Sequence, residues 1–143
     1  MSRMPKAQPF SFRPSVSLDA RLSALAKQSH RTKASVLESL ADEGERSRRY
    51  PGVAFRGPDS NRRAWMIGAG LDVWQIARAL EDFGGDPTRM AQETDLNIRH
   101  ILLAHAYHQE FPAEIDLAIE ADRRHIDQLQ REYPFVQSLV IED

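Results

Sequence analysis

The sequence contains no cysteine, which excludes disulfide frameworks, thiolate metal ligands and cysteine nucleophiles. It also has no apolar run that approaches the roughly 20 residues of a membrane-spanning helix. The first residues carry charges without the apolar stretch of a secretory signal peptide. Together these absences predict a cytoplasmic protein that has no membrane partner.

The motifs of the common enzyme classes are missing from the sequence as well. There is no phosphate-binding loop, no dinucleotide fingerprint and no Ser–His–Asp order, and the lone Gly68-x-Gly70 pair is typical of a turn. His100, His105 and His108 share one predicted helix, but His100 is rotated by roughly 140° from His105 around the helix axis. We therefore expect no catalytic residue, no metal and no cofactor, in a protein that is not an enzyme.

Charged residues are spread unevenly along the 143 residues, although the net charge is only −2. Residues 1–50 hold 10 lysines and arginines against 5 acidic residues, residues 51–111 hold 6 against 8, and residues 112–143 hold 3 against 8. A basic N-terminal end favours a phosphate-bearing partner and an acidic C-terminal end favours a basic protein surface, unless the split is ordinary scatter. The hydrophobic fraction of 41% supports a small core that a second subunit would help to complete.

Residues 10–18 alternate between apolar side chains at positions 10, 12, 16 and 18 and polar ones at positions 11, 13, 15 and 17. This period of two predicts a half-buried strand, which Pro14 makes short, peripheral or broken. Capping by Ser17 or Asp19 then predicts a helix to about Ser29, and Thr32 begins a second helix.

Beyond residue 50 the pattern changes. Two short apolar segments, 53–55 and 64–67, flank turn-forming residues and predict a β-hairpin. Helices are expected to begin near Asp72, Pro87 and Asn97, and a charged helix to run from 113 to about 132.

The predicted fold is mainly α with short β elements. It consists of an N-terminal strand-helix-helix, a β-hairpin plus a three-helix helix-turn-helix core, and a C-terminal helix. The expected segments are 1–50, 51–120 and 121–143.

Short ordered blocks in the first segment carry a family likeness: Val16–Ser17–Leu18, Arg21–Leu22, Leu25–Ala26 and the stretch from Thr32 to Leu37. They resemble the ribbon-helix-helix family of bacterial DNA-binding proteins, with Pro14 and His30 as departures. That family pairs two chains through antiparallel strands and places the polar face of the ribbon in the major groove. The alternative is a helical hairpin whose strand serves dimerisation only. The resemblance implies base contacts from the ribbon and phosphate contacts from the second helix, by Ser11, Arg13, Ser15, Thr32 and Lys33.

Ordered blocks across residues 51–120 carry a second likeness: Pro51–Gly52–Val53, Arg63–Ala64, Gly70–Leu71–Asp72–Val73–Trp74, Gly84–Gly85, Ala104–His105–Ala106–Tyr107 and the stretch from Phe111 to Asp116. They look like a small prokaryotic domain of unknown function with a homeodomain-like helix-turn-helix core, common in VapB-type antitoxins beside a PIN-like toxin. The resemblance implies DNA contacts from Arg99 and His100. The neighbouring Glu93 and Asp95 favour instead a dimerisation or partner scaffold.

The chain ends in an apolar, β-prone tail that contains Tyr133, Phe135, Val136, Leu139 and Ile141. In antitoxins of this resemblance such a tail neutralises the toxin, here by strand addition or groove binding; the alternative is packing on its own domain. We expect the antitoxin of a type II toxin–antitoxin system, a homodimer or higher even oligomer, that binds operator DNA as a repressor and neutralises a PIN-like ribonuclease toxin. The alternatives are a stand-alone DNA-binding transcriptional regulator and a non-DNA-binding oligomerisation module.

Overall fold

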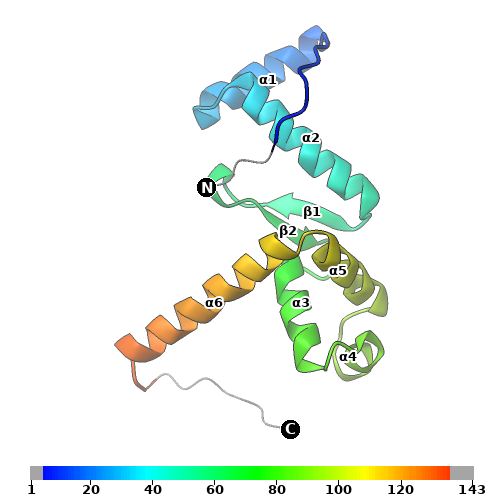
Figure 1. Cartoon of the computed structure of the whole chain (residues 1–143), viewed down its shortest axis with the longest axis vertical. Helices are drawn as coiled ribbons and strands as arrows, with labels where there is room; N and C mark the ends of the chain where they lie inside the picture. Colours follow the sequence, from blue (N-terminus) through cyan, green and yellow to red (C-terminus); the bar gives the residue numbers. More distant parts are fainter. Residues whose placement is uncertain (1–4, 136–143) are drawn as a thin grey trace. The chain divides into compact units, whose positions relative to one another are not determined.

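The computed structural model describes residues 5–135, which are mainly helical with one two-stranded antiparallel sheet, as the sequence predicts. Figure 1 labels the elements, which are α1 (Val16–Ser29), α2 (Lys33–Arg49), β1 (Val53–Arg56), the short 3-10 helix η1 (Asp59–Asn61), β2 (Arg63–Met66), α3 (Val73–Asp82), α4 (Pro87–Glu93), α5 (Ile98–Glu110) and α6 (Pro112–Glu132). None of the helices described is long and apolar enough to cross a membrane. The chain divides into two compact units, residues 1–42 and residues 43–143.

The first unit contains α1 and the beginning of α2. The side chain of Ser15 caps α1 by accepting a hydrogen bond from the Leu18 N–H at 3.1 Å. At the other end His30 adopts a left-handed conformation (φ 55°) and closes the helix through its backbone N–H. Thr32 caps α2 by accepting from the Ser35 N–H at 3.1 Å. The core of this unit is small, with Leu22, Ala26 and Val36 as its buried residues.

The predicted strand over residues 10–18 is wrong for the single chain. Residues 5–15 have no regular secondary structure, and α1 already begins at Val16, so the cap is Ser15 rather than Ser17 or Asp19. The physical reason is twofold: Ser15 is committed to the helix cap, and one extended segment alone has no neighbour to form a ladder with. The alternation therefore leaves Phe10 and Val16 each 89% exposed.

The second unit begins with the end of α2 and the predicted hairpin, which the structure confirms. Val53 pairs with Met66 and Phe55 with Ala64, so that Arg56 and Arg63 stand directly opposite each other. The turn between the strands needs Gly57, which has φ +105° and whose missing Cβ would collide with the Asn61 carbonyl oxygen.

The core of the second unit lies between the hairpin and three helices, because α3 packs against α5 and α6, and also against β2. Capping residues set the helix starts, since Asp86 accepts from the Thr88 and Arg89 N–H groups and Asn97 accepts from the Arg99 N–H. The largest side chains that are fully buried are Tyr107, Met66, Ile76, Met90, Ile101, Val53 and Val73.

Candidate functional site

Ser11 and Arg13 lie on the exposed segment before α1, and Arg13 has no ion pair with any residue between 5 and 135. The other three residues expected to contact DNA in the first unit are already engaged. Ser15 and Thr32 cap their helices, and Lys33 Nζ lies 2.9 Å from Asp19 Oδ1. Arg13 is therefore the long polar side chain of this set that is open to a ligand.

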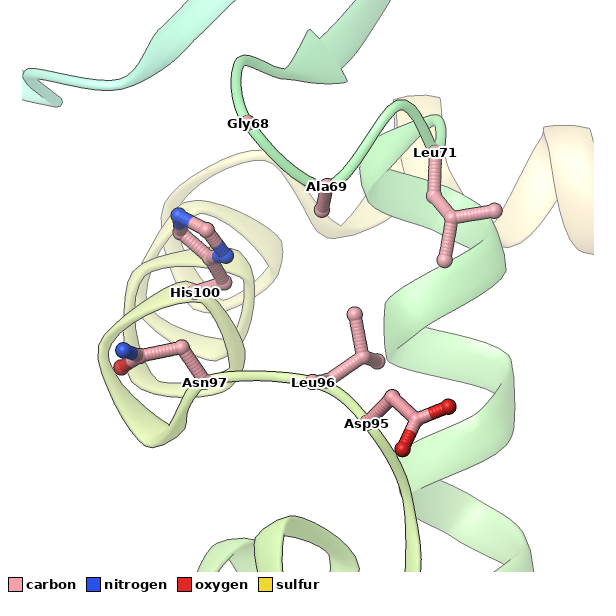
Figure 2. Close-up of a pocket in the computed structure, with 7 residues that line it drawn as sticks. All are labelled: Gly68, Ala69, Leu71, Asp95, Leu96, Asn97 and His100. Atoms are coloured by element: carbon pink, nitrogen blue, oxygen red, sulfur yellow. The ribbon is translucent and has the colours of Figure 1, made fainter.

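Arg99 and His100 both lie at the start of α5, but their side chains have different surroundings. Arg99 is exposed and forms no ion pair within the described part of the chain. His100 is partly buried, and Figure 2 shows its ring beside the loop of Gly68 and Ala69. A Cβ added at Gly68 would lie 3.4 Å from His100 Cε1, so this loop and the imidazole are in close contact. A shallow pocket opens there, lined by Gly68, Ala69, Leu71, Asp95, Leu96, Asn97 and His100.

A buried carboxylate that the sequence marks only as a helix start joins the hairpin to α3. The Asp72 side chain is 7% exposed and accepts hydrogen bonds from three other side chains, from Arg56 Nε at 2.9 Å, Arg63 Nε at 2.9 Å and Trp74 Nε1 at 3.2 Å. Burial alone would raise the pKa of Asp72, but the bonds from Arg63 and Arg56 outweigh burial, so its pKa lies below the ordinary value.

The two arginines stand opposite each other in the hairpin, and the anion between them removes the repulsion of like charges. A carboxylate whose oxygens are occupied by these donors is not available as a general base. The sequence signal for this role of Asp72 is the pair Arg56 and Arg63. That these two arginines lie opposite each other becomes evident only when the register of the hairpin is known.

A second polar cluster fixes the end of α2 to α5 and α6. Arg46 Nη1 donates to Tyr107 Oη and to Glu114 Oε1, both at 2.9 Å, and Tyr107 donates to Glu114 Oε2 at 2.7 Å. The Arg46 guanidinium also lies 3.8 Å from the centre of the Phe111 ring. Burial, together with the bond to Glu114, raises the pKa of Tyr107 above its ordinary value, so the phenol stays neutral. This cluster is structural in character.

The C-terminal end presents an exposed aromatic pair. Tyr133 is 47% and Phe135 80% exposed, and their rings meet edge to face with centres 5.9 Å apart. Of the remaining residues expected to bind a partner, Val136, Leu139 and Ile141 lie outside the described residues.

Residues 5–135 contain no group of three or more His, Cys, Asp or Glu side chains that could hold a metal ion. In the same part of the chain every buried side-chain nitrogen and oxygen has a hydrogen-bond partner. The polar clusters are thus satisfied internally, and of the residues predicted to bind DNA or a partner, Ser11, Arg13, Arg99 and the aromatic pair remain exposed in the described part of the chain.

No family model matches the chain, and no similar sequence among curated proteins and no similar solved structure was found.

Proposed function

We propose that this protein is the antitoxin of a type II toxin–antitoxin pair, in which a dimer binds operator DNA through the first unit and a PIN-like ribonuclease toxin through the C-terminal end. The observation that carries the proposal is the charge difference between the two units. Residues 1–42 hold 7 lysines and arginines against 3 acidic residues, a balance of +4, whereas residues 43–143 hold 12 against 18, a balance of −6. The negative charge of a nucleic acid attracts the first unit, and a basic protein surface attracts the second unit.

Arg13 supports a DNA contact in the first unit. Its guanidinium is exposed and has no ion pair within residues 5–135 that binding would break, and it can donate two parallel hydrogen bonds to a guanine edge. Thr32 and Lys33 begin α2, where backbone N–H groups and the helix dipole favour a phosphate. The Lys33–Asp19 pair is about half exposed, so exchanging Asp19 for a phosphate costs little.

The α3–α4–α5 region, the predicted helix-turn-helix, supports a scaffold role more than a DNA contact. Arg99 is the only lysine or arginine in α5, and Glu93 and Asp95 precede it. A helix that reads a groove needs phosphate contacts from several cations around it. This charge pattern favours a second candidate function, a non-DNA-binding oligomerisation module, which predicts no affinity for promoter DNA.

The C-terminal end supports a contact with a basic protein. The core contacts of α6 come from its first half, through Ile115 and Ile119. Asp122 and Arg123 still form ion pairs with α3, and beyond them Figure 1 shows the helix running away from α3 and α5. Residues 120–143 hold six acidic residues against three arginines. Exposed Tyr133 and Phe135 beside this charge offer apolar anchors with an acidic surround, the combination that suits a positively charged groove.

Titration of the promoter fragment upstream of the gene tests the DNA half. At about 100 mM salt we expect saturable binding that is tighter for this fragment than for a shuffled one, and that weakens steeply as salt rises, because phosphate contacts release counterions. Absence of binding to both fragments would favour the oligomerisation module.

Co-purification with the product of the adjacent gene tests the toxin half. The double variant Tyr133→Ala/Phe135→Ala should bind that product at least ~30-fold more weakly, because two exposed anchors at an interface centre each contribute about 1–2 kcal/mol. Leu117→Ala is the matched control, since Leu117 is 65% exposed on α6, the helix that precedes the anchors, but is distant from them in sequence. Equal binding by the wild type and the double variant contradicts the assignment.

A further inference from the structure

One side of α5 is exposed and partly apolar. Leu102 is 50% exposed, and Ala106, one turn further along the helix, is exposed as well. Arg99 and Glu110 are exposed near the two ends of the same side. These four positions, which fall within about 80° of one another around the helix axis, are called the α5 face below. The opposite side of the helix carries the buried residues Ile101, Ala104 and Tyr107.

The apolar part of the α5 face continues onto the hairpin. A Cβ added at Gly52 would lie 3.1 Å from Leu103 Cδ2, so one end of the hairpin is in close contact with α5. The Ile67 N–H donates to the Gly52 carbonyl at 2.8 Å, which places Ile67 at this same end, and Ile67 is 51% exposed. Apolar side chains from two elements therefore meet at one surface. Contiguous apolar surface of this kind marks a contact with another protein.

We propose that the α5 face packs against the α5 face of a second copy of this chain, with the two helices antiparallel and Leu102 of each copy over Ala106 of the other. The interface lies entirely in the second unit. It goes beyond the proposed function, because it requires neither the DNA contact nor the toxin contact.

The charges at the ends of the α5 face select a second copy in the antiparallel direction. In this arrangement Arg99 of each copy lies beside Glu110 of the other, and the positive end of each helix dipole lies beside a negative end. Parallel helices would instead bring Arg99 to Arg99 and Glu110 to Glu110. Arg99 has no ion pair among residues 5–135 that the contact would break. The Glu110 carboxylate bonds to Arg49 and Tyr50 and has lone pairs for a further donor.

The side chains at the centre of the α5 face fix the register. Ala106 ends at a methyl group, so the two helix axes can approach to about 8–9 Å while Leu102 of the other copy fills the space above it. Sliding the helices until Leu102 faces Leu102 would place Arg99 opposite His105. Sliding them until Ala106 faces Ala106 would place Leu102 against the Glu110 carboxylate. The register with Leu102 over Ala106 is the one that joins apolar to apolar and cation to anion.

Ala106→Arg tests the interface, because it places a long cation at the centre of the proposed contact. Ala106 is exposed, so the variant should fold like the wild type, which circular dichroism checks. Sedimentation velocity of the full chain without DNA, over about 1–200 µM because a single helix pair is a small interface, should show a self-association step. Ala106→Arg should weaken that step at least ~30-fold.

Ala121→Arg is the matched control, since Ala121 is exposed on α6, and its self-association should stay within about twofold of the wild type. Unchanged self-association in Ala106→Arg, or none in the wild type, overturns the proposal and means that the α5 face serves another occupant. No DNA or toxin is present in this measurement, so failure of the proposed function leaves its outcome unaffected.

Two single-cysteine variants test the register, because the protein has no cysteine of its own. With Cα atoms about 2.3 Å from each helix axis, the Cα of residue 102 in one copy lies about 4–5 Å from that of residue 106 in the other. The two copies of either residue lie about 7 Å or more apart, at the limit of a disulfide. An oxidised equimolar mixture of differently tagged Leu102→Cys and Ala106→Cys chains should therefore yield the mixed dimer in excess over random pairing. Random proportions, or an excess of either homodimer, overturn the register.

Discussion

Replacement of the buried Asp72 carboxylate by an amide should strongly destabilise the second unit. Asp72→Asn preserves the shape of the side chain but leaves Arg56 and Arg63 facing each other without an anion. Breaking a buried ion pair by removing one partner costs about 3–5 kcal/mol. Because the two arginines are 38% and 36% exposed, water recovers part of this loss, and we expect about 3 kcal/mol less free energy of unfolding. For a chain of this length that corresponds to a melting temperature lower by roughly 10 °C.

The pH dependence of the same variant gives an independent check. The pKa of Asp72 lies below its ordinary value of 3.8 in the folded state, so its contribution to stability is fully present above about pH 4 and is lost as the pH falls through the lowered pKa. The stability difference between the wild type and Asp72→Asn should therefore shrink in acid.

Urea unfolding followed by circular dichroism between pH 3 and pH 7 measures both effects. Asp82→Asn is the matched control, because the Asp82 side chain is exposed and makes no hydrogen bond or ion pair among residues 5–135; its effect should stay within about 0.5 kcal/mol. An Asp72→Asn variant as stable as the wild type at pH 7 would refute the reasoning.

Two further changes test the architecture by chemical unfolding. Tyr107→Phe removes the hydroxyl that joins Arg46 to Glu114 and should cost about 1–2 kcal/mol; no loss would mean that the Arg46–Glu114 pair compensates alone. Gly57→Ala should destabilise the protein by at least ~1 kcal/mol, because Gly57 has φ +105° and an added Cβ would meet the Asn61 backbone. Gly44 lies inside α2 with open space around it, so Gly44→Ala should stabilise the protein by about 0.5–1 kcal/mol. Equal effects at the two glycines would contradict the turn geometry.

The local signals in the sequence predict the second unit well. Turn residues between two apolar segments give the hairpin, and Asp72, Pro87 and Asn97 each mark the start of a helix, because the signals for a helix start are decided within a few residues. The first strand failed for the opposite reason. Alternation at 10–18 indicates which side chains favour a common face, but a strand needs a neighbouring strand to bond with, and in the single chain Ser15 instead caps a helix that begins at Val16.

The interactions that join distant segments could not be predicted from the sequence. Asp72 and Arg56 are 16 residues apart, and Arg46 and Glu114 are 68 apart, so each pair depends on how the elements pack. His100 shows the same limit: its position at the start of a helix favoured an outward side chain, but the loop at Gly68 lies against its ring.

A comparison of promoter binding by Arg13→Ala and Arg99→Ala tests the central claim most directly. Both arginines are exposed and neither has an ion pair among residues 5–135, so the pair is matched in chemistry. By fluorescence anisotropy at about 100 mM salt, Arg13→Ala should weaken binding at least ~10-fold, because a dimer loses two base contacts worth about 1–3 kcal/mol each. Arg99→Ala should stay within about twofold of the wild type, as expected for a residue that does not touch the DNA. Strong loss in Arg99→Ala with none in Arg13→Ala, or no binding by the wild type, would contradict the account.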